Sequence, residues 1–304
     1  MHPETNETIM RRAETIFFTG YLAVAALLQV AVGNLPFRFF AYPVNLLVAA
    51  LWLFALWMWY KDYREGRAIR FLLSPSMTVF TLVSFIAGCM VIGLFPQLSA
   101  EEAAAKTGLW GSLGCYDFMT SWIFVSILFL LLTHLALVTY RGAFRARKFR
   151  WRFVANHAGL WLALFAGFFG SADCQNLRIP VLKGEASSRA YSMEGKVVYL
   201  DYELELLSFD ADYYENGMPR HYEAKVRAGK DTARLEVNHP YSYRWGEDIY
   251  LTGYERKSGQ TAYCVLQIVR QPWKYVQLAG ILLTLIGGVL LFVEGPVNKK
   301  KLQK

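Results

Sequence analysis

The sequence predicts a polytopic α-helical membrane protein with six transmembrane helices and an extracytoplasmic all-β domain. Three observations lead to this fold class. Hydrophobic residues make up 55% of the 304 residues, and they are concentrated in blocks of about 20 residues, the length that crosses a bilayer as a helix. Lysine and arginine cluster between alternate blocks. One long polar segment shows the period-two alternation of β-strands.

Six apolar blocks have the length of transmembrane helices. They cover residues 15–33, 43–60, 73–95, 117–140, 153–171 and 276–293. No small-residue cleavage site precedes the second block, so the first is not predicted to be a cleaved signal peptide. These blocks divide the chain into an N-terminal two-helix segment (1–60), a three-helix region (61–171), an outer domain (172–275) and a last helix with a basic tail (276–304).

The cations predict the orientation of the helices. Those on one side are Arg11, Arg12, Lys61, Arg64, Arg67, Arg70, Arg141, Arg145, Arg147, Lys148, Arg150, Arg152, Lys299, Lys300, Lys301 and Lys304. The two short connections of the other side contain Arg38 and Lys106. The positive-inside rule therefore predicts that both termini are cytoplasmic. The positive charges are dispersed between the helices, so the net charge of +8 reflects the orientation of the helices in the membrane. We therefore expect no nucleic-acid partner.

The polar segment 172–275 is expected to form the β domain. In its longest alternating run, one set of residues would face the core and the other the solvent: Val198, Leu200, Tyr202, Leu204 and Leu206 alternate with Tyr199, Asp201, Glu203 and Glu205. Shorter alternations occur at Leu235/Val237, Ile249/Leu251 and Cys264/Leu266/Ile268. Asn216-Gly217 and Ser258-Gly259 are turn signals. Several tyrosines and no convergent catalytic set favour contact with a partner over a small-molecule pocket.

The four cysteines exclude several redox and metal motifs. Cys89, Cys115, Cys174 and Cys264 form no Cys-x-x-Cys, which argues against a thioredoxin-like motif, a cysteine zinc site and a covalent haem attachment sequence. Cys174 and Cys264 can form a disulfide on the oxidising side or can be two small buried hydrophobic residues.

Hydrolase and metalloprotease functions have no support in the sequence. It contains no Gly-rich phosphate loop, Gly-x-Ser-x-Gly elbow or His-Glu-x-x-His. The outer histidines His221 and His239 lie in loop-like sequence without an acidic or cysteine neighbour at ligand spacing. We therefore predict no catalytic residue.

Two histidines fall within apolar blocks, and they are the candidates for a cofactor site. His134 precedes Arg141 and His157 follows Arg152, so at about 1.5 Å per residue they lie roughly 10 and 8 Å inside the cytoplasmic boundary. An imidazole in hydrocarbon needs partners for its ring nitrogens. The residues alone leave open a ligand role and a helix–helix hydrogen bond.

The fifth block has two different faces. Ala155, Gly159, Ala163 and Gly167 form a ridge of small residues on which another helix can pack closely. His157 shares the opposite stripe with Trp161, Leu164 and Phe168. This stripe suits a porphyrin with imidazole as an axial ligand to iron, although an aromatic stripe is also typical of helix packing.

From residue 71 to about 295 the order of features resembles the ResB-type family of cytochrome c biogenesis. The resemblance rests on four segments: SPSMTVFTLVSFIAGCMVIGLFPQ, SWIFVSILFLLLTHLALVTYRG, NHAGLWLALFAGFFGS and, after the β domain, VLQIVRQPWKYVQLAGILLTLIGGVLLF. Two additional helices precede this region. The resemblance implies a multi-pass protein of the bacterial inner membrane in a system II complex that exports haem and attaches it to apocytochrome c.

The resemblance also implies roles for the membrane residues. His157 matches the third-helix histidine of the family and would be an axial ligand to the iron of haem b. His134 is the second candidate ligand, and Trp161 would lie beside the porphyrin ring. The tryptophan-rich haem-presenting motif is absent, so a companion synthase subunit would supply it and this chain would be the non-catalytic half. The alternative is a structural or sensory membrane protein whose β domain binds an envelope partner.

Overall fold

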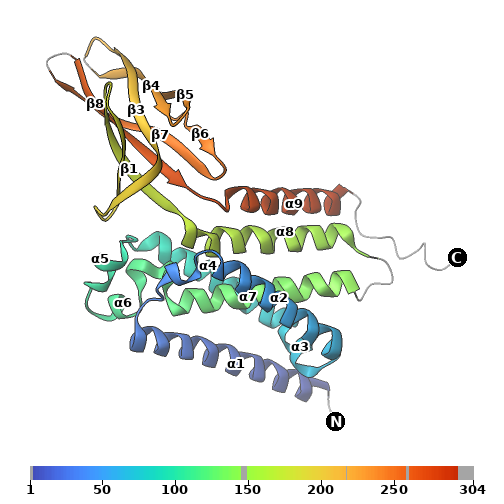
Figure 1. The fold of residues 1–304 in the computed structure, drawn as a ribbon. Helices are drawn as coiled ribbons and strands as arrows, with labels where there is room; N and C mark the ends of the chain where they lie inside the picture. The colour runs from blue at the N-terminus through green and yellow to red at the C-terminus, as the bar shows by residue number, and fades with distance from the viewer. Residues whose placement is uncertain (1–2, 145–148, 217, 258–259, 294–304) are drawn as a thin grey trace. The chain divides into compact units, whose positions relative to one another are not determined.

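The computed structural model describes residues 3–144, 149–216, 218–257 and 260–293. It divides the chain into a helical unit, residues 1–165 with 276–304, and a β unit, residues 166–275 (Figure 1). Several predicted features lie outside the described residues: Gly217, Ser258, Gly259, Arg145, Arg147, Lys148, Lys299, Lys300, Lys301 and Lys304.

Among the described residues, six helices are long and apolar enough to cross a membrane, judged by length and composition. They are α1 (Pro3–Val32), α2 (Val44–Tyr63), α4 (Pro75–Leu94), α7 (Trp122–Phe144), α8 (Trp151–Phe168) and α9 (Lys274–Val293). A 3₁₀ turn, η3 (Phe169–Asp173), continues α8. These helices confirm the six predicted apolar blocks. α7 packs against α1, α2 and α4 and is the most buried of them.

The predicted start of the fourth helix is wrong. Residues from 117 onward were expected to be helical, but the chain forms the 3₁₀ segment η2 (Cys115–Thr120) and α7 begins at Trp122. Asp117 has a non-helical backbone conformation, and its carbonyl accepts a hydrogen bond from the Asn34 side chain. The Ser121 hydroxyl accepts from the Phe124 amide, as an N-cap does. Hydropathy alone does not detect this cap.

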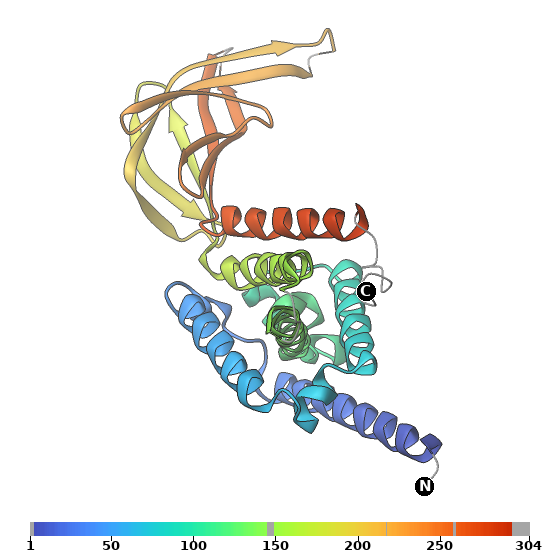
Figure 2. The ribbon, with the colours of Figure 1, turned by 90° about the vertical axis from the view of Figure 1, so that its right-hand side faces the viewer.

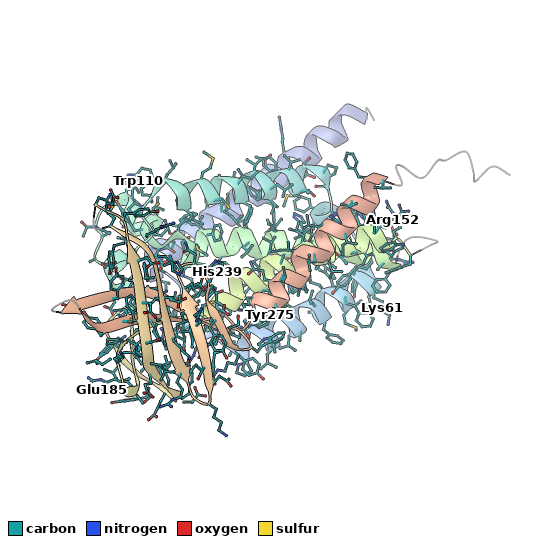
Figure 3. All side chains as sticks on the ribbon, turned by 90° about the horizontal axis from the view of Figure 1, so that it is seen from above. Lys61, Trp110, Arg152, Glu185, His239 and Tyr275 are labelled. Carbon is teal, nitrogen blue, oxygen red and sulfur yellow. The ribbon has the colours of Figure 1, made fainter. Side chains whose placement is uncertain are left out.

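Short helices occupy the connections between the long ones. They are η1 (Phe37–Phe40), α3 (Arg67–Leu72), α5 (Ala100–Ala104) and α6 (Leu109–Ser112). Ser99 and Glu102 form a reciprocal capping box that fixes the start of α5. Figure 3 labels Trp110 in α6 at one end of the helices, and Lys61 and Arg152 at the other end.

The β unit is one antiparallel sheet, as the alternation predicts. Its strands are β1 (Gln175–Leu182), β2 (Ala186–Ser192), β3 (Val197–Tyr213), β4 (Pro219–Ala228), β5 (Asp231–Glu236), β6 (Tyr241–Arg244), β7 (Glu247–Lys257) and β8 (Gln260–Arg270). The strand order is β5-β4-β3-β2-β1-β8-β7-β6. β5 also contacts β6 and β7, so the sheet curls around its own core (Figure 2).

One face of this sheet forms the core. Leu200, Tyr202, Leu204 and Leu206 of β3 are buried, whereas Tyr199 is exposed, which confirms the longest predicted alternation. The inward residues of other strands join the same core: Ile179, Val181, Val226, Leu235, Ile249, Cys264, Leu266 and Ile268. Burial on alternate positions is the pattern of a sheet with one solvated face.

Strand register rules out the disulfide between Cys174 and Cys264. Val181 of β1 pairs with Cys264, and Cys174 precedes β1, so about seven residues of extended chain separate the two sulfurs by roughly 20 Å. A disulfide requires Cα atoms less than about 7 Å apart. Both cysteines are free. Cys264 is a buried core residue, as the alternative predicted, but Cys174 is exposed, so the alternative is wrong for that residue.

Candidate functional site

His157 lies in the second turn of α8, and its ring orientation is fixed. Its Nδ1 is 2.9 Å from the carbonyl oxygen of Phe153, four residues earlier. Because a carbonyl only accepts, Nδ1 carries the proton and donates it, which leaves the lone pair on Nε2. Among the described residues, the His157 ring makes its hydrogen bond through Nδ1 and none through Nε2. This is the tautomer in which a histidine binds a metal through Nε2.

An aromatic and cationic group surrounds His157. The Phe153 ring stacks on the imidazole with centroids 4.0 Å apart, and the Arg150 guanidinium lies 4.9 Å from the centroid of the Phe153 ring. Arg141 is also close enough to interact electrostatically with the imidazole. These two cations would attract carboxylates bound beside His157.

Trp161 lies one turn after His157 but is part of the helix packing. It is buried, stacks on Phe165 with centroids 4.9 Å apart, and lies 6.3 Å from the Trp52 ring of α2. Its indole N–H has no hydrogen-bond acceptor among the described residues. A buried donor without a partner is unfavourable, so this indole N–H is an unsatisfied polar group of the helix packing.

The ridge of small residues on α8 packs against α9, as predicted. A Cβ at Gly159 would lie 2.6 Å from the Thr284 amide and 2.8 Å from the Gly280 carbonyl. The Asn156 side chain donates to the carbonyl of Thr284 at 2.9 Å. This close contact explains why both helices have glycine at the crossing, and it leaves the His157 stripe on another face of α8.

His134 lies in a different environment from His157. It is 4% exposed, and one turn away Leu130 packs with Phe18 of α1 and Met77 of α4. Neither ring nitrogen makes a hydrogen bond of normal geometry among the described residues, and the backbone of Leu72 is the polar group near it. The described contacts do not join His134 and His157 in one site.

The outer histidines form no metal site in the described chain. His221 was expected in a loop, which is wrong: it lies in β4 and pairs with Asp212 of β3. His239 lies in the turn between β5 and β6, where its amide donates to the carbonyl of Glu236. Both side chains are exposed. Among the described residues there is no group of three or more potential metal ligands.

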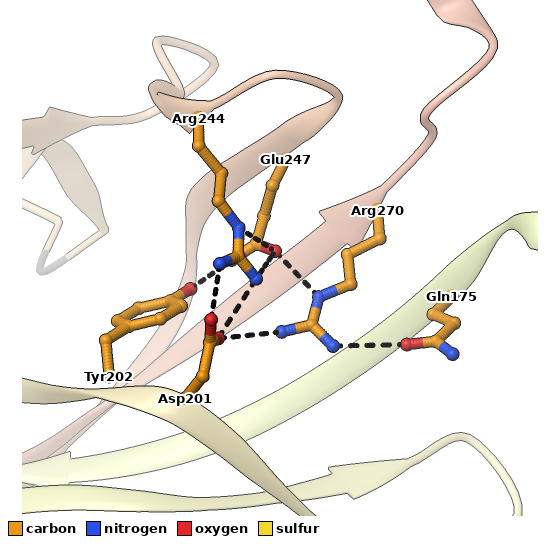
Figure 4. Close-up of polar contacts among 6 residues, drawn as sticks. All are labelled: Gln175, Asp201, Tyr202, Arg244, Glu247 and Arg270. Atoms are coloured by element: carbon orange, nitrogen blue, oxygen red, sulfur yellow. Dashed lines mark hydrogen bonds and ion pairs between the residues drawn. The ribbon is translucent and has the colours of Figure 1, made fainter.

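A cluster of charged side chains surrounds the buried Glu247 in the sheet (Figure 4). Glu247, 2% exposed, accepts hydrogen bonds from Arg270 Nε at 2.7 Å, from Arg244 Nη2 at 3.0 Å and from the Tyr202 hydroxyl. Arg244 also donates to Asp201. Burial, with the neighbouring Glu247, raises the pKa of Tyr202 above its ordinary value. The carboxylate is thus neutralised by two arginines, an arrangement suited to structure rather than to proton transfer.

A match to a protein family covers α8 and most of the sheet. Residues 139–265 match the ResB-like family. This confirms the resemblance found in the sequence over that range. The match includes α8 with His157, strands β1 to β7 and the first half of β8. No curated protein matches the chain. The ResB-like match indicates a part in cytochrome c biogenesis.

Sequence reasoning missed the charge cluster around Glu247. Its members come from β3, β6, β7 and β8, so no linear motif contains them. One signal was present. Glu247 stands two and four residues before the inward Ile249 and Leu251, and a glutamate at an inward position of a strand requires cationic partners.

The cluster also holds the link that follows β8. The β6–β7 turn contains Trp245 and Gly246. Gly246 has a φ of +71°, and its carbonyl accepts from the Gln271 amide, while the Trp245 indole donates to the Pro272 carbonyl at 3.2 Å. Arg244 and Glu247 flank this turn, so the ion pairs and the turn together fix residues 270–272.

Asp201 makes the cluster weakly sensitive to acid. Its pKa lies below the ordinary value, mainly because its carboxylate accepts a hydrogen bond from Arg244. The resulting stabilisation is present above the pKa of an unfolded aspartate and is lost as the pH falls through the lower, folded pKa. Because the Asp201 side chain is 62% exposed, solvent screening keeps this contribution small.

Thiol labelling should distinguish Cys174 from Cys264. Burial raises the pKa of Cys264 to about 12, and the thiolate is the reactive form, so we expect alkylation of Cys264 only after denaturation. Cys174 is exposed and should react in the folded protein at about pH 8.5, although burial and Asp173 raise its pKa. Peptide mass spectrometry checks both residues, and a linked Cys174–Cys264 peptide would contradict the register.

Proposed function

We propose that this protein is a multi-pass protein of the bacterial inner membrane that acts in cytochrome c biogenesis. In this proposal it is the non-catalytic subunit of a system II complex that exports haem and attaches it to apocytochrome c. The ResB-like match over residues 139–265 is the observation that carries it. The six apolar helices support insertion in the membrane.

The residues around His157 fit a haem. Nδ1 is occupied by the Phe153 carbonyl, so Nε2 would bind the iron, and Arg141 and Arg150 would pair with the propionates. The Trp161 indole N–H, one turn after His157, has no acceptor among the described residues. When bound, haem would supply the vinyl groups to which the apocytochrome thiols are attached; this chain would bind and orient the haem and exclude water.

A second axial ligand would come from the companion subunit. His134 is the candidate within this chain, but it is enclosed toward α1 and α4 and would need to open to bind iron. Supply of the second ligand by the synthase subunit, which would also hold the tryptophan-rich motif, requires no such opening. His134 would then support the helix packing.

The β unit would be the docking domain of the complex. Trp245 is 70% exposed and Tyr199 is exposed on the outer face of β3, and aromatic side chains of this kind are enriched in protein interfaces. The companion subunit and apocytochrome c are the partners that we propose for it.

Co-expression with a synthase subunit tests the proposed function. In a host that lacks its own cytochrome c assembly genes, the pair should produce mature cytochrome c, and the purified pair should show a haem absorbance spectrum. Each subunit expressed alone is the control. Full maturation by the synthase subunit without this chain would contradict the proposal.

Reporter fusions test the proposed orientation. Alkaline phosphatase fused after Ser187, in the β unit, should be active because the enzyme folds on the oxidising side. The same reporter fused after Arg64, between α2 and α3, should be inactive, because the positive-inside rule keeps that connection in the cytoplasm. Reversed activities would refute this topology.

A further inference from the structure

A cavity of about 800 Å³ lies at the end of the helical unit opposite Lys61 and Arg152. One wall comes from the end of α1 and the connection to α2, residues 29–38, and the other from the connection between α4 and α7, residues 100–120. The additional N-terminal helices therefore build half of a cavity with the region that resembles the family.

A network of hydrogen bonds forms the floor of this cavity and joins its two walls. Gln29 is buried; its Nε2 donates to Asn34 at 2.6 Å, and its Oε1 accepts from the Trp122 amide at 2.9 Å. Asn34 in turn donates to the Asp117 carbonyl and to the Thr120 hydroxyl. These polar groups are satisfied, so the floor is rigid and needs no ligand of its own.

Unlike these hydrogen-bonded groups, the two cations of this cavity have no oppositely charged partner among the described residues. Arg38 and Lys106, one from each wall, both line it, and they are the lysine and arginine of the two short connections on the side predicted to be poor in positive charge. Neither forms an ion pair with a described residue; the Lys106 ammonium lies 5.7 Å from the Tyr116 ring centroid. Asp117, the acidic residue in the lining, accepts from Thr120 at 2.6 Å.

The remaining lining and the rim are apolar. Val30, Val32, Leu35, Phe37 and Ala103 line the cavity. Phe39 and Trp110, near the rim in sequence, are 68% and 53% exposed, and aromatic residues gather at the level of lipid head groups. Apolar walls with two cations that form no ion pair with a described residue complement a molecule that has an anionic head and an apolar body.

We propose that this cavity binds the phosphate head group of an anionic phospholipid. The Arg38 guanidinium supplies a planar fork for the phosphate oxygens and Lys106 a second charge, while the acyl chains lie along the exposed apolar surface of α1, which includes Leu27 and Val30. The described lining contains no histidine, methionine or cysteine, the side chains that most often bind haem iron, which favours a lipid over a porphyrin. This inference rests on the proposed insertion in a membrane and not on haem binding.

Native mass spectrometry of the full-length protein in detergent tests the proposal. Dioleoyl phosphatidylglycerol should bind about tenfold more tightly than dioleoyl phosphatidylcholine, which has the same chains, because each surface cation adds to anionic-lipid affinity. The double variant Arg38→Gln/Lys106→Gln should lose this preference. The matched control Arg64→Gln/Arg67→Gln, at the opposite end of the helices, should keep it.

Three results would overturn the lipid assignment. The first is equal affinity for the two lipids, and the second is an unchanged preference in the Arg38→Gln/Lys106→Gln variant. The third is displacement of phosphatidylglycerol by haem in the wild-type protein, if the binding of haem is lost when Arg38 is replaced. Both substituted side chains are exposed, so the variants should fold, and size-exclusion chromatography verifies this. Membrane fractionation of the same cells tests insertion separately, and no step depends on cytochrome c maturation.

Discussion

Replacing His157 with alanine is expected to reduce the haem content of the purified complex at least about tenfold, the scale on which loss of a metal-site interaction acts. Cytochrome c maturation should fall with it. The reason is geometric: the Phe153 carbonyl fixes Nδ1 as the donor, so Nε2 is the nitrogen that remains for iron. Alanine is tolerated in a helix in lipid, so the variant should insert and accumulate normally. Absorbance spectroscopy and a maturation assay measure the two effects.

Two further measurements separate a ligand role from a packing role. Added imidazole should restore part of the haem content of the His157→Ala protein, because it can enter the vacated ligand position; a lost packing contact would not be restored. His134→Ala, the matched control on α7, should have a smaller effect unless both ligands come from this chain. A His157→Ala complex with normal haem and full maturation would leave this histidine a structural residue.

Replacing Glu247 with alanine is expected to destabilise the β unit by about 3 kcal/mol. Removing one partner of a buried ion pair costs about 3–5 kcal/mol because the remaining charge is left unpaired. The lower value applies here, because the Arg244 side chain is 43% exposed and can turn toward water. The amides of β7 and β8 should then exchange with deuterium roughly a hundredfold faster in the full-length protein, at about 1.4 kcal/mol for each tenfold change.

The matched control for Glu247 is Glu205→Ala. Glu205 pairs with Arg227 across β3 and β4 of the same sheet, but this arginine is mostly exposed, and such pairs contribute about 1 kcal/mol or less. Its exchange rates should change little. If Glu247→Ala exchanged no faster than Glu205→Ala, the buried cluster would not be a stabilising element of the sheet.

Features with a local pattern could be predicted from the sequence. The six apolar blocks correspond to the six long helices, because a helix of sufficient length and hydropathy depends on neighbouring residues only. The same holds for β3, where side chains alternate between core and solvent. The ridge through Gly159 was predicted as a contact surface, although its partner, Gly280 on α9, could not be identified from α8 alone.

Features that need a distant partner could not be predicted. The first amide of α7, that of Trp122, donates to the side chain of Gln29, far earlier in the chain. The assignment of His221 to a loop failed because its place in β4 depends on pairing with β3. Similarly, the spacing of Cys174 and Cys264 left a disulfide open until the register of β1 and β8 separated them.

For the candidate site, the sequence by itself determined which residues are available: His157 and His134 within apolar helices, and a chain without a catalytic motif. The tertiary structure decided how they are used. It set the proton of His157 on Nδ1, enclosed His134 toward α1 and α4, and brought Glu247 between Arg244 and Arg270. Hydrophobic periodicity is encoded locally, whereas the partners of a polar atom are chosen by helices and strands that meet only when the chain folds.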